Sequence, residues 1–492
     1  MTYIPEGMYN TDMTNLTRLS LVLAAVGCTF FGCETVDRAR DAQEGVARAT
    51  NDVAVAASTN ALRHVDLKDC DLYGYVAFAM TNRPSLEASR LAVSNAVLAL
   101  KAVTADRELQ VNLSGGYSQS SLNTGSHFSW RQKRGKGTAD IALDILICDW
   151  GRIDARELEA RENLVAAQRD LADEEFAVFN EVAQAYFGVL RNDALLEVAC
   201  TNEHVYAEHL KESETLYSAG EAKKLDVLKA RVDLSDARLA TINASNDVTT
   251  ASAEFLRSLG LEVDAATRED VLAVAENAFA TAHRNLTETR YDATEGLQLA
   301  RTNAPALMVL RAKLRASSAR VDYAVADLLP ELRLSSAFSF ADPTWNWSWG
   351  FKAVQTILDG FRKETAIDRA VVDMETARTA VEVAEQKLSY DLAVATANRD
   401  NARKAFDTAT VAVRQARENL ETVAAQYRVG DASRLDFTDA VNTLTSALGT
   451  RVKTFYASEV AEAELIRLTG HVPPYANRKV GTLREVNDHE MD

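Results

Sequence analysis

Long, alanine-rich stretches with almost no helix breakers dominate the pattern of hydrophobic and polar positions along this chain. Only 7 prolines and 21 glycines occur in 492 residues, and both are scarce between about Gly151 and Gly260. Proline removes a backbone donor, and glycine costs about 1 kcal/mol in a helix interior. We therefore predict continuous helices from Arg152 to Tyr217 and from Arg362 to Tyr427. At about 1.5 Å per residue each is near 100 Å long, so the helices must pack along their length as coiled coil.

The landmarks of these stretches occur twice in the chain. Four pairs of segments carry them: 149–152 and 359–362, 217–226 and 427–436, 259–260 and 469–470, and 82–84 and 303–305. The first three pairs are 210 residues apart, whereas the Asn-x-Pro pair is 221 apart. The first copy is therefore 11 residues longer between its Asn-x-Pro and its Asp-x-x-Arg landmark. Because loops tolerate insertions best, we expect the extra length in the loop that joins the first pair of strands.

A pair of short alternating segments interrupts the helices in each copy. Trp345, Trp347 and Trp349 fall on one face of such a segment, with small polar residues on the other face. This pattern is typical of a membrane β-strand whose aromatic face forms a girdle against lipid and whose polar face contacts water. The alternative is a sandwich strand that buries its aromatic side chains. The two pairs of predicted strands are 109–114 with 141–148, and 332–340 with 345–351.

The strands also limit the number of copies in the assembly. Four strands cannot close a barrel, and an open sheet edge is not viable in lipid. Three copies would supply twelve strands, an even number within the range of outer-membrane barrels. We therefore predict a mostly α fold with a small β part. It comprises a long α-helical coiled-coil tube, a trimeric 12-stranded transmembrane β-barrel with four strands per protomer, and an internal twofold sequence repeat.

The N-terminal residues predict export. Arg18 precedes the apolar run 19–33, which is too short to span a bilayer but fits a secretory signal peptide. Cys33 and Cys28 each follow a glycine and resemble the end of a bacterial lipobox, whose cysteine becomes lipidated. We favour Cys33, and a signal peptide without lipidation is the alternative.

The three cysteines after Cys33 predict no disulfide framework, and the later apolar runs predict no transmembrane helix. An odd number of cysteines without a CxxC pair cannot form a full disulfide set, so we expect buried small apolar side chains. No second apolar run is long enough for a transmembrane helix. The cysteines concerned are Cys70, Cys148 and Cys200.

The net charge argues against a nucleic-acid-binding protein, and the absence of catalytic motifs argues against an enzyme. A net charge of -17 is unsuited to nucleic-acid binding, which needs basic patches. The chain has no Gly-rich phosphate loop and no GxSxG motif. His204 and His209 are five residues apart, which is the wrong spacing for two metal ligands on one helical face. We predict no enzyme activity, no cofactor, no metal site and no nucleic-acid partner.

The duplicated landmarks, in their order and spacing, resemble the TolC/OprM-type outer membrane factors of Gram-negative bacteria over about residues 61–471. The resemblance implies a homotrimer in the outer membrane that contacts its lipid and extends into the periplasm. It also implies partners, namely a periplasmic adaptor (membrane fusion protein) and an inner-membrane pump. The implied function is a passive trans-periplasmic exit duct for small molecules or drugs in a tripartite efflux system. Pro330, at the start of the second strand pair, has no counterpart in the first copy.

Two alternatives to the efflux duct stay open. One is a type I protein-secretion outlet, which the sequence does not separate from it. The other, of a different class, is a structural periplasmic coiled-coil lipoprotein, which would not need the aromatic strands. The segments expected are a signal peptide at 1–33, an N-terminal periplasmic segment at 34–60, a helix at 61–107, a β-hairpin at 108–148, a long helical hairpin at 149–260, a linker at 261–290, a helix at 291–329, a second β-hairpin at 330–358, a second helical hairpin at 359–470 and a tail at 471–492.

The turns between the long helices are the predicted control points. Gly220 and Gly430 each follow a long helix and would be its C-cap. The resemblance places Asp436 and Asp439 at a periplasmic gate, where threefold symmetry would gather a cation-attracting ring of carboxylates. Asp436 could instead be a helix N-terminal carboxylate facing the helix dipole, and the two roles can coexist.

A latch that holds these turns closed is a further expectation. Its candidate residues are Tyr427, Asp226 and Arg434, beside the glycines of the two turns. Arg434 is offset from the usual basic position of the family, where Ala432 stands.

Overall fold

The computed structural model describes most of the chain from residue 72 to residue 470. The described residues are 72–118, 121–122, 131–132, 136–220, 223–261, 293–341, 344–356, 358–429 and 431–470. Several predictions fall outside them: the signal peptide, Cys28 and Cys33, the segment 34–60, the linker 261–290 beyond residue 261, Gly430 and the tail 471–492.

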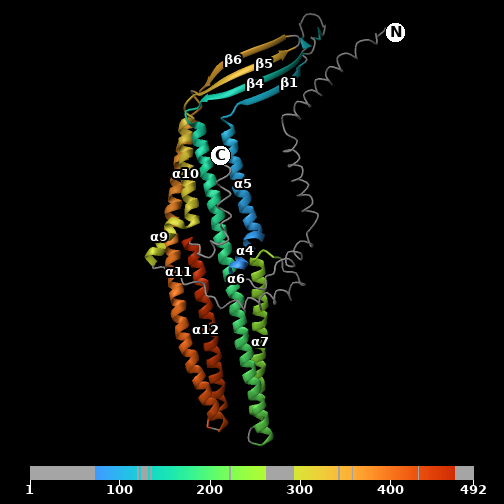
Figure 1. The fold of residues 1–492 in the computed structure, drawn as a ribbon, viewed down its shortest axis with the longest axis vertical. Coiled ribbons are helices and arrows are strands. Elements are labelled where there is room, and N and C mark those ends of the chain that lie inside the picture. The colour runs from blue at the N-terminus through green and yellow to red at the C-terminus, as the bar shows by residue number, and fades with distance from the viewer. Residues whose placement is uncertain are drawn as a thin grey trace, which may run out of the picture. The chain divides into compact units, whose positions relative to one another are not determined.

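The helices of the described residues form two series of matching length (Figure 1). The two longest, α6 and α11, have 67 residues each and begin at Arg152 and Arg362, as predicted. Each ends one residue beyond the predicted tyrosine. The bounds are α4 Leu72–Asn82, α5 Pro84–Ala105, α6 Arg152–Ser218, α7 Lys224–Ser258, α9 Ala293–Asn303, α10 Pro305–Ala326, α11 Arg362–Arg428 and α12 Arg434–Thr469.

The helices predicted at 61–107 and 291–329 are each divided in two at the Asn-x-Pro motif, which corrects the prediction of single helices. Arg83 and Ala304 have extended backbone, with ψ angles of 125° and 115°. The ring of the following proline disfavours the helical conformation for the residue before it. Pro84 and Pro305 then occupy the first turn of α5 and α10, where a missing N–H is tolerated.

The two glycines that follow α7 and α12 lie against these breaks. Gly260 and Gly470 have φ angles of +80° and +61°. A Cβ on Gly260 would lie 3.2 Å from the Asn82 carbonyl oxygen, and one on Gly470 would lie 2.6 Å from that of Asn303. Only glycine combines this conformation with so close an approach. We call the two contacts the first joint and the second joint.

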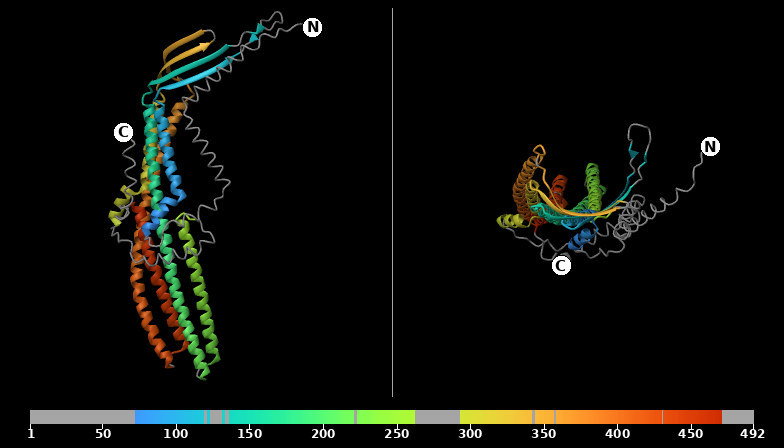
Figure 2. Two further views of the ribbon diagram at one scale, coloured as in Figure 1. Left: turned by 45° about the vertical axis from the view of Figure 1, so that its right-hand side comes forward. Right: turned by 90° about the horizontal axis from the view of Figure 1, so that it is seen from above.

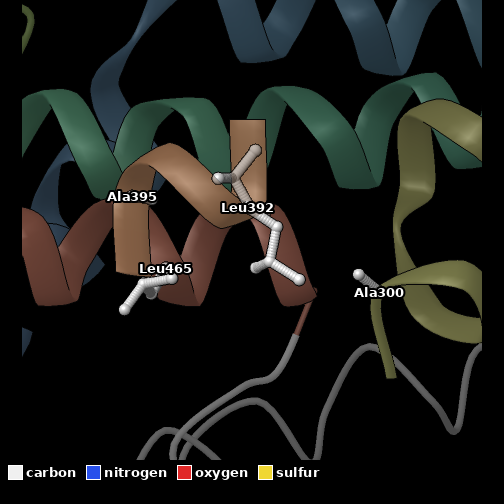
Figure 3. Packing of buried hydrophobic residues seen from close by; sticks show 5 residues of the cluster. Ala300, Leu392, Ala395 and Leu465 are labelled. Atoms are coloured by element: carbon white, nitrogen blue, oxygen red, sulfur yellow. The ribbon is translucent and has the colours of Figure 1, made fainter. Parts of the chain in front are cut away.

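Small and aliphatic side chains fill the spaces between the helices. Helix α6 packs against α4, α5, α7, α10 and α12, and α11 packs against α9, α10 and α12. At the second joint, one cluster comprises Ala300, Leu392, Ala395, Leu465 and Leu468 (Figure 3). The two described cysteines do not join such clusters, contrary to expectation, because Cys148 is half-buried and Cys200 is exposed; Cys70 lies outside the described residues.

Four of the described strands form one antiparallel sheet in the order β1-β4-β5-β6, and β2 pairs with β3 in a separate two-stranded sheet. Pairing of β4 with β5 joins the two predicted hairpins into a single sheet. The described residues add two short strands, β2 and β3, to the four that were predicted, and both lie in the long connection between β1 and β4. That connection spans residues 119–135, whereas only residues 342 and 343 join β5 to β6, so the extra length lies where it was expected. The bounds are β1 Gln110–Ser118, β2 Ser121–Leu122, β3 Arg131–Gln132, β4 Lys136–Cys148, β5 Glu331–Ala341 and β6 Thr344–Val354.

The Asp-x-x-Arg motifs form the turns from strand to long helix. Trp150 and Phe361 have positive φ angles of 59° and 65°, each next to a glycine that also has positive φ. Asp149 accepts hydrogen bonds from the backbone N–H groups of Gly151 and Ile153 and so caps α6. Pro330 does not disturb the entry to β5, because α5 and α10 end in the same conformation.

Among the described residues, no helix is both long enough and apolar enough to cross a bilayer.

Candidate functional site

The four-stranded sheet has one apolar and one polar face. Residues opposite each other in antiparallel strands share a face, so the register fixes both sets. The polar face carries Asn112, Ser114, Asp140, Asp144, Arg333, Ser335, Ser339, Asn346, Ser348 and Lys352. The apolar face carries Val111, Leu113, Ile141, Leu143, Ile145, Leu334, Phe338, Phe340, Trp345, Trp347, Trp349 and Phe351.

The three tryptophans of β6 lie on the apolar face, as the alternation predicted. Trp345, Trp347 and Trp349 are 69%, 61% and 65% exposed. This exposure excludes the alternative of a sandwich strand that buries its aromatic side chains within this chain. Phe338 packs on Trp345 with ring centroids 6.0 Å apart, and the Trp347 indole donates to the Ser336 hydroxyl at 3.0 Å. A contiguous apolar face with so many exposed aromatic side chains is uncommon on a soluble protein. It is typical of a surface that contacts lipid or another protein.

The sheet also ends in two open edges. Strands β1 and β6 each have a single neighbour in the four-stranded sheet, and the sheet curves between them (Figure 2). The outer backbone groups of both edges therefore require a partner wherever water is excluded.

The turns at the far ends of the long helices hold the predicted control residues. Gly220 follows the actual C-cap of α6, Ala219, and has a φ of +85° with open space around it. Asp436 belongs to a capping box at the start of α12. Its carboxylate accepts from the backbone N–H of Ser433 at 2.9 Å and from the Ser433 hydroxyl at 2.7 Å.

These hydrogen bonds confirm Asp436 as a helix-capping carboxylate. They hold the pKa of Asp436 below its usual range, because they stabilise the ionised form. Asp439 lies one turn further along α12 and is exposed. Whether the two carboxylates also form a gate stays a prediction.

The contact between α6 and α12 near these turns is held by polar bonds. The Tyr206 hydroxyl donates to the Asn442 side chain at 3.1 Å, and the Thr445 hydroxyl donates to the Asn202 side chain at 3.0 Å. We call this contact, defined by these four residues, the seam. It connects the hairpin α6/α7 to the hairpin α11/α12.

Two of the three candidate latch residues take part in contacts around the seam. Arg434 forms an ion pair of 2.6 Å with Asp233 of α7, and both side chains are about one-fifth exposed. The Tyr427 ring packs against Phe437 with centroids 5.6 Å apart. Sequence reasoning missed Asp233. Its position seven residues after Asp226, on the same face of α7, is the signal that could have found it.

Three comparisons with known proteins agree with this geometry. The model of the outer membrane efflux protein family matches residues 77–261 and 296–471. The chain belongs to that family. The chain is 23% identical over 349 residues to the outer membrane efflux protein BepC of Brucella suis biovar 1 (strain 1330), which covers 69% of this chain and 73% of BepC.

Solved structures of low sequence identity share the fold. The CusC crystal structure has a TM-score of 0.71 and 20% identity, and the alignment covers 82% of this chain and 92% of CusC. VceC of Vibrio cholerae has a TM-score of 0.70 and 16% identity, with 81% of this chain and 96% of VceC covered. The resemblance to TolC-like outer membrane channels is confirmed, and with it the location in the outer membrane of a Gram-negative bacterium.

The family consists of efflux channels rather than enzymes, and its members work in tripartite systems, generally as trimers. In this member, the described residues hold no group of three or more potential metal-ligating side chains. A groove of 1140 Å³ lies between the two helical hairpins. Its charged lining mixes both signs: Glu181, Arg191, Asp247, Glu254, Arg257, Lys453 and Glu464.

Proposed function

We propose that three copies of this chain close one barrel and one helical tube, which serve as a passive exit duct for small molecules. The partners would be a periplasmic adaptor and an inner-membrane pump. The observation that carries the proposal is the sheet with one apolar face, one polar face and two open edges. In a closed barrel of twelve strands, β6 of one copy pairs with β1 of the next. The tryptophan face then contacts lipid, and the polar face lines the pore.

The free side of α7 supports lateral assembly. Helices α6 and α12 are neighbours, so α7 and α11 lie on the flanks of the four-helix group. A row of apolar side chains runs along α7 at the heptad spacing of a coiled-coil interface, and each of them is between 48% and 65% exposed. We assign this row to the contact with a neighbouring copy. Its members are Leu225, Leu228, Val232, Leu239 and Ile242.

The distal turns would form the gate of the duct. Three copies of Asp436 and Asp439 would gather carboxylates at the constriction, and the Arg434–Asp233 pair would hold the two hairpins together beside it. Lipidation at Cys33, or at Cys28, would add a second attachment to the outer membrane.

Imaging and bilayer recordings test the assembly. We expect single particles of the detergent-extracted protein to show a threefold tube longer than about 100 Å with a short barrel at one end. A monomer, or a rod without a lumen, would contradict the duct and favour a structural coiled-coil lipoprotein. In cells, deletion should raise accumulation of small toxic compounds. A defect confined to the secretion of one protein would point to a type I outlet.

The gate has a separate test in ion selectivity. We expect Asp439→Asn to reduce cation preference in bilayers without disturbing the capping box that Asp436 forms. Asp322→Asn on α10, an exposed carboxylate far from the turns, is the matched control. Unchanged selectivity in Asp439→Asn would remove this residue from the gate while leaving the duct in place.

A further inference from the structure

A buried histidine lies beside the seam, close to the distal turns. His209 of α6 is 2% exposed. Its ring stacks on Phe437 of α12 with centroids 4.8 Å apart, and lies against Tyr427 of α11 at 5.3 Å. Three rings from three helices thus form one contact, which we call the histidine cluster. Any separation of α6 from α11 and α12 has to break it.

The imidazole of His209 is buried without hydrogen bonds. Neither Nδ1 nor Nε2 has a partner among the described residues. Buried polar atoms are almost always paired, and an exception requires an explanation. A phenylalanine at this position would stack on the same rings without leaving two ring nitrogens unpaired. The property that distinguishes histidine here is its ability to bind a proton in the physiological pH range.

Charged groups on three helices face the cluster. Burial lowers the pKa of His209 below its ordinary value; Glu212 of α6 opposes this, Arg434 of α12 lowers the pKa further, and Asp233 of α7 opposes it. From α11, Tyr427 contributes a phenol whose own pKa burial raises, so it stays neutral. Since Asp233 is already paired with Arg434, it is only partly available to balance a second positive charge.

We propose that His209 is a proton-sensitive latch, in which protonation of the buried imidazole separates α6 from α11 and α12 and opens the distal turns. This proposal rests on the proposed duct. An imidazolium has two N–H donors, and neither finds an acceptor while the cluster is closed. The aromatic faces offset part of the charge, but they do not accept both donors. Water can reach the ring when the seam opens.

The direction of the effect follows from the lowered pKa. The closed cluster binds a proton more weakly than the open one, so it is most stable above the ordinary histidine pKa of about 6.5 and loosens as the pH falls below it. Each unit by which burial lowers the pKa shifts the opening equilibrium by up to about tenfold per copy.

The experiment records the full-length protein in planar bilayers between about pH 7.5 and about pH 5. We expect the open probability of the wild type to rise by about threefold or more on acidification. His209→Phe keeps the stack but cannot bind the proton, so its open probability should stay constant. His209→Leu is the second non-titrating variant, for use if His209→Phe does not assemble. Asp439→Asn should retain the response, which would exclude the exposed carboxylate as its source.

A disulfide across the seam tests separately whether α6 and α12 must separate for the acid response, and it leaves the histidine cluster unchanged. Asn202 and Thr445 now share a hydrogen bond, so Asn202→Cys with Thr445→Cys, in a Cys200→Ser background, should link α6 to α12. The oxidised channel should lose the acid response and regain it on reduction.

Two results would overturn the latch while leaving the duct intact: a conducting wild type without an acid response, or a His209→Phe channel that responds as the wild type does. A correctly assembled protein that never conducts would refute the duct and the latch together.

Discussion

At the first joint, Tyr75 of α4 is fully buried between Tyr186 of α6 and Phe255 of α7, with ring centroids 6.0 and 5.2 Å away. At the second joint, the cluster around Ala300 and Leu465 is aliphatic throughout. Both joints nevertheless place a positive-φ glycine against the turn before a proline. The two halves therefore share a backbone contact, and the space around it is filled by rings at the first joint and by aliphatic chains at the second.

Truncating the core of each joint should give the largest effect. Phe255→Ala removes contacts with two buried rings, Tyr75 and Tyr186, and should cost about 3–5 kcal/mol. Leu465→Ala, the residue 210 positions later, should cost less, within about 2–5 kcal/mol. The thermal unfolding midpoint of the detergent-extracted protein measures both. A larger loss in Leu465→Ala would show that the aliphatic joint is the better packed of the two.

Alanine at three glycines separates backbone strain from crowding. Gly220 has positive φ but open space, so Gly220→Ala should cost only the left-handed conformation, about 1–2 kcal/mol. Gly470→Ala should cost about 1–3 kcal/mol more, because its Cβ would overlap the Asn303 carbonyl. Gly260→Ala should fall between them. Equal losses in all three, measured by the same unfolding midpoint, would mean that the joints adapt to a methyl group.

The helical hairpins α6/α7 and α11/α12 also differ in buried charge, at a pair of equivalent positions in α7 and α12. Glu462 of α12 is 3% exposed and lies 3.7 Å from Arg403, whereas the equivalent position in the first hairpin is Ser252, whose hydroxyl bonds to its own helix. Glu462→Gln should destabilise the protein by about 1–3 kcal/mol, since it puts an amide N–H2 donor at a buried site where the carboxylate offers only acceptors. Ser252→Ala should change stability by no more than about 0.5 kcal/mol. Denaturant titration of both variants measures the change in the free energy of unfolding. An unchanged stability of Glu462→Gln would show that the charge is dispensable.

The smallest expected effect concerns the starts of α7 and α12. Ser433 caps α12 with its side chain, but Lys223, at the start of α7, makes no side-chain cap bond. Ser433→Ala should cost about 0.5–2 kcal/mol, and Lys223→Ser should gain up to about 1 kcal/mol by supplying the missing cap. Hydrogen exchange of the first turn of each helix reports the change locally. Slower exchange in α7 without any change in α12 is the result expected for Lys223→Ser.

Local features of the fold could be predicted from the sequence, because they depend on neighbouring residues. The scarcity of proline and glycine predicted α6 and α11, and alternation predicted the shared face of Trp345, Trp347 and Trp349. The break at Arg83 was missed because the apolar pattern continues on both sides of Pro84.

Pairings between distant segments could not be predicted in the same way. Alternation gives the two faces of β4 and β5 but does not say that the strands are neighbours. The histidine cluster draws one residue from each of three helices, and each residue is unremarkable within its own helix. Asp233 was likewise hidden, because only the ion pair between the two helical hairpins brings it to Arg434.

The unbroken length of α6 and α11 has a mechanical consequence. Each runs for 67 residues from the strands to the distal turns, so each is a lever arm of about 100 Å. A tilt of about two degrees at the strand end displaces the other end by about 3–4 Å. Such a tilt leaves the strand register unchanged. In the proposed trimer, the aperture at the far end would therefore widen while the strands stay almost still.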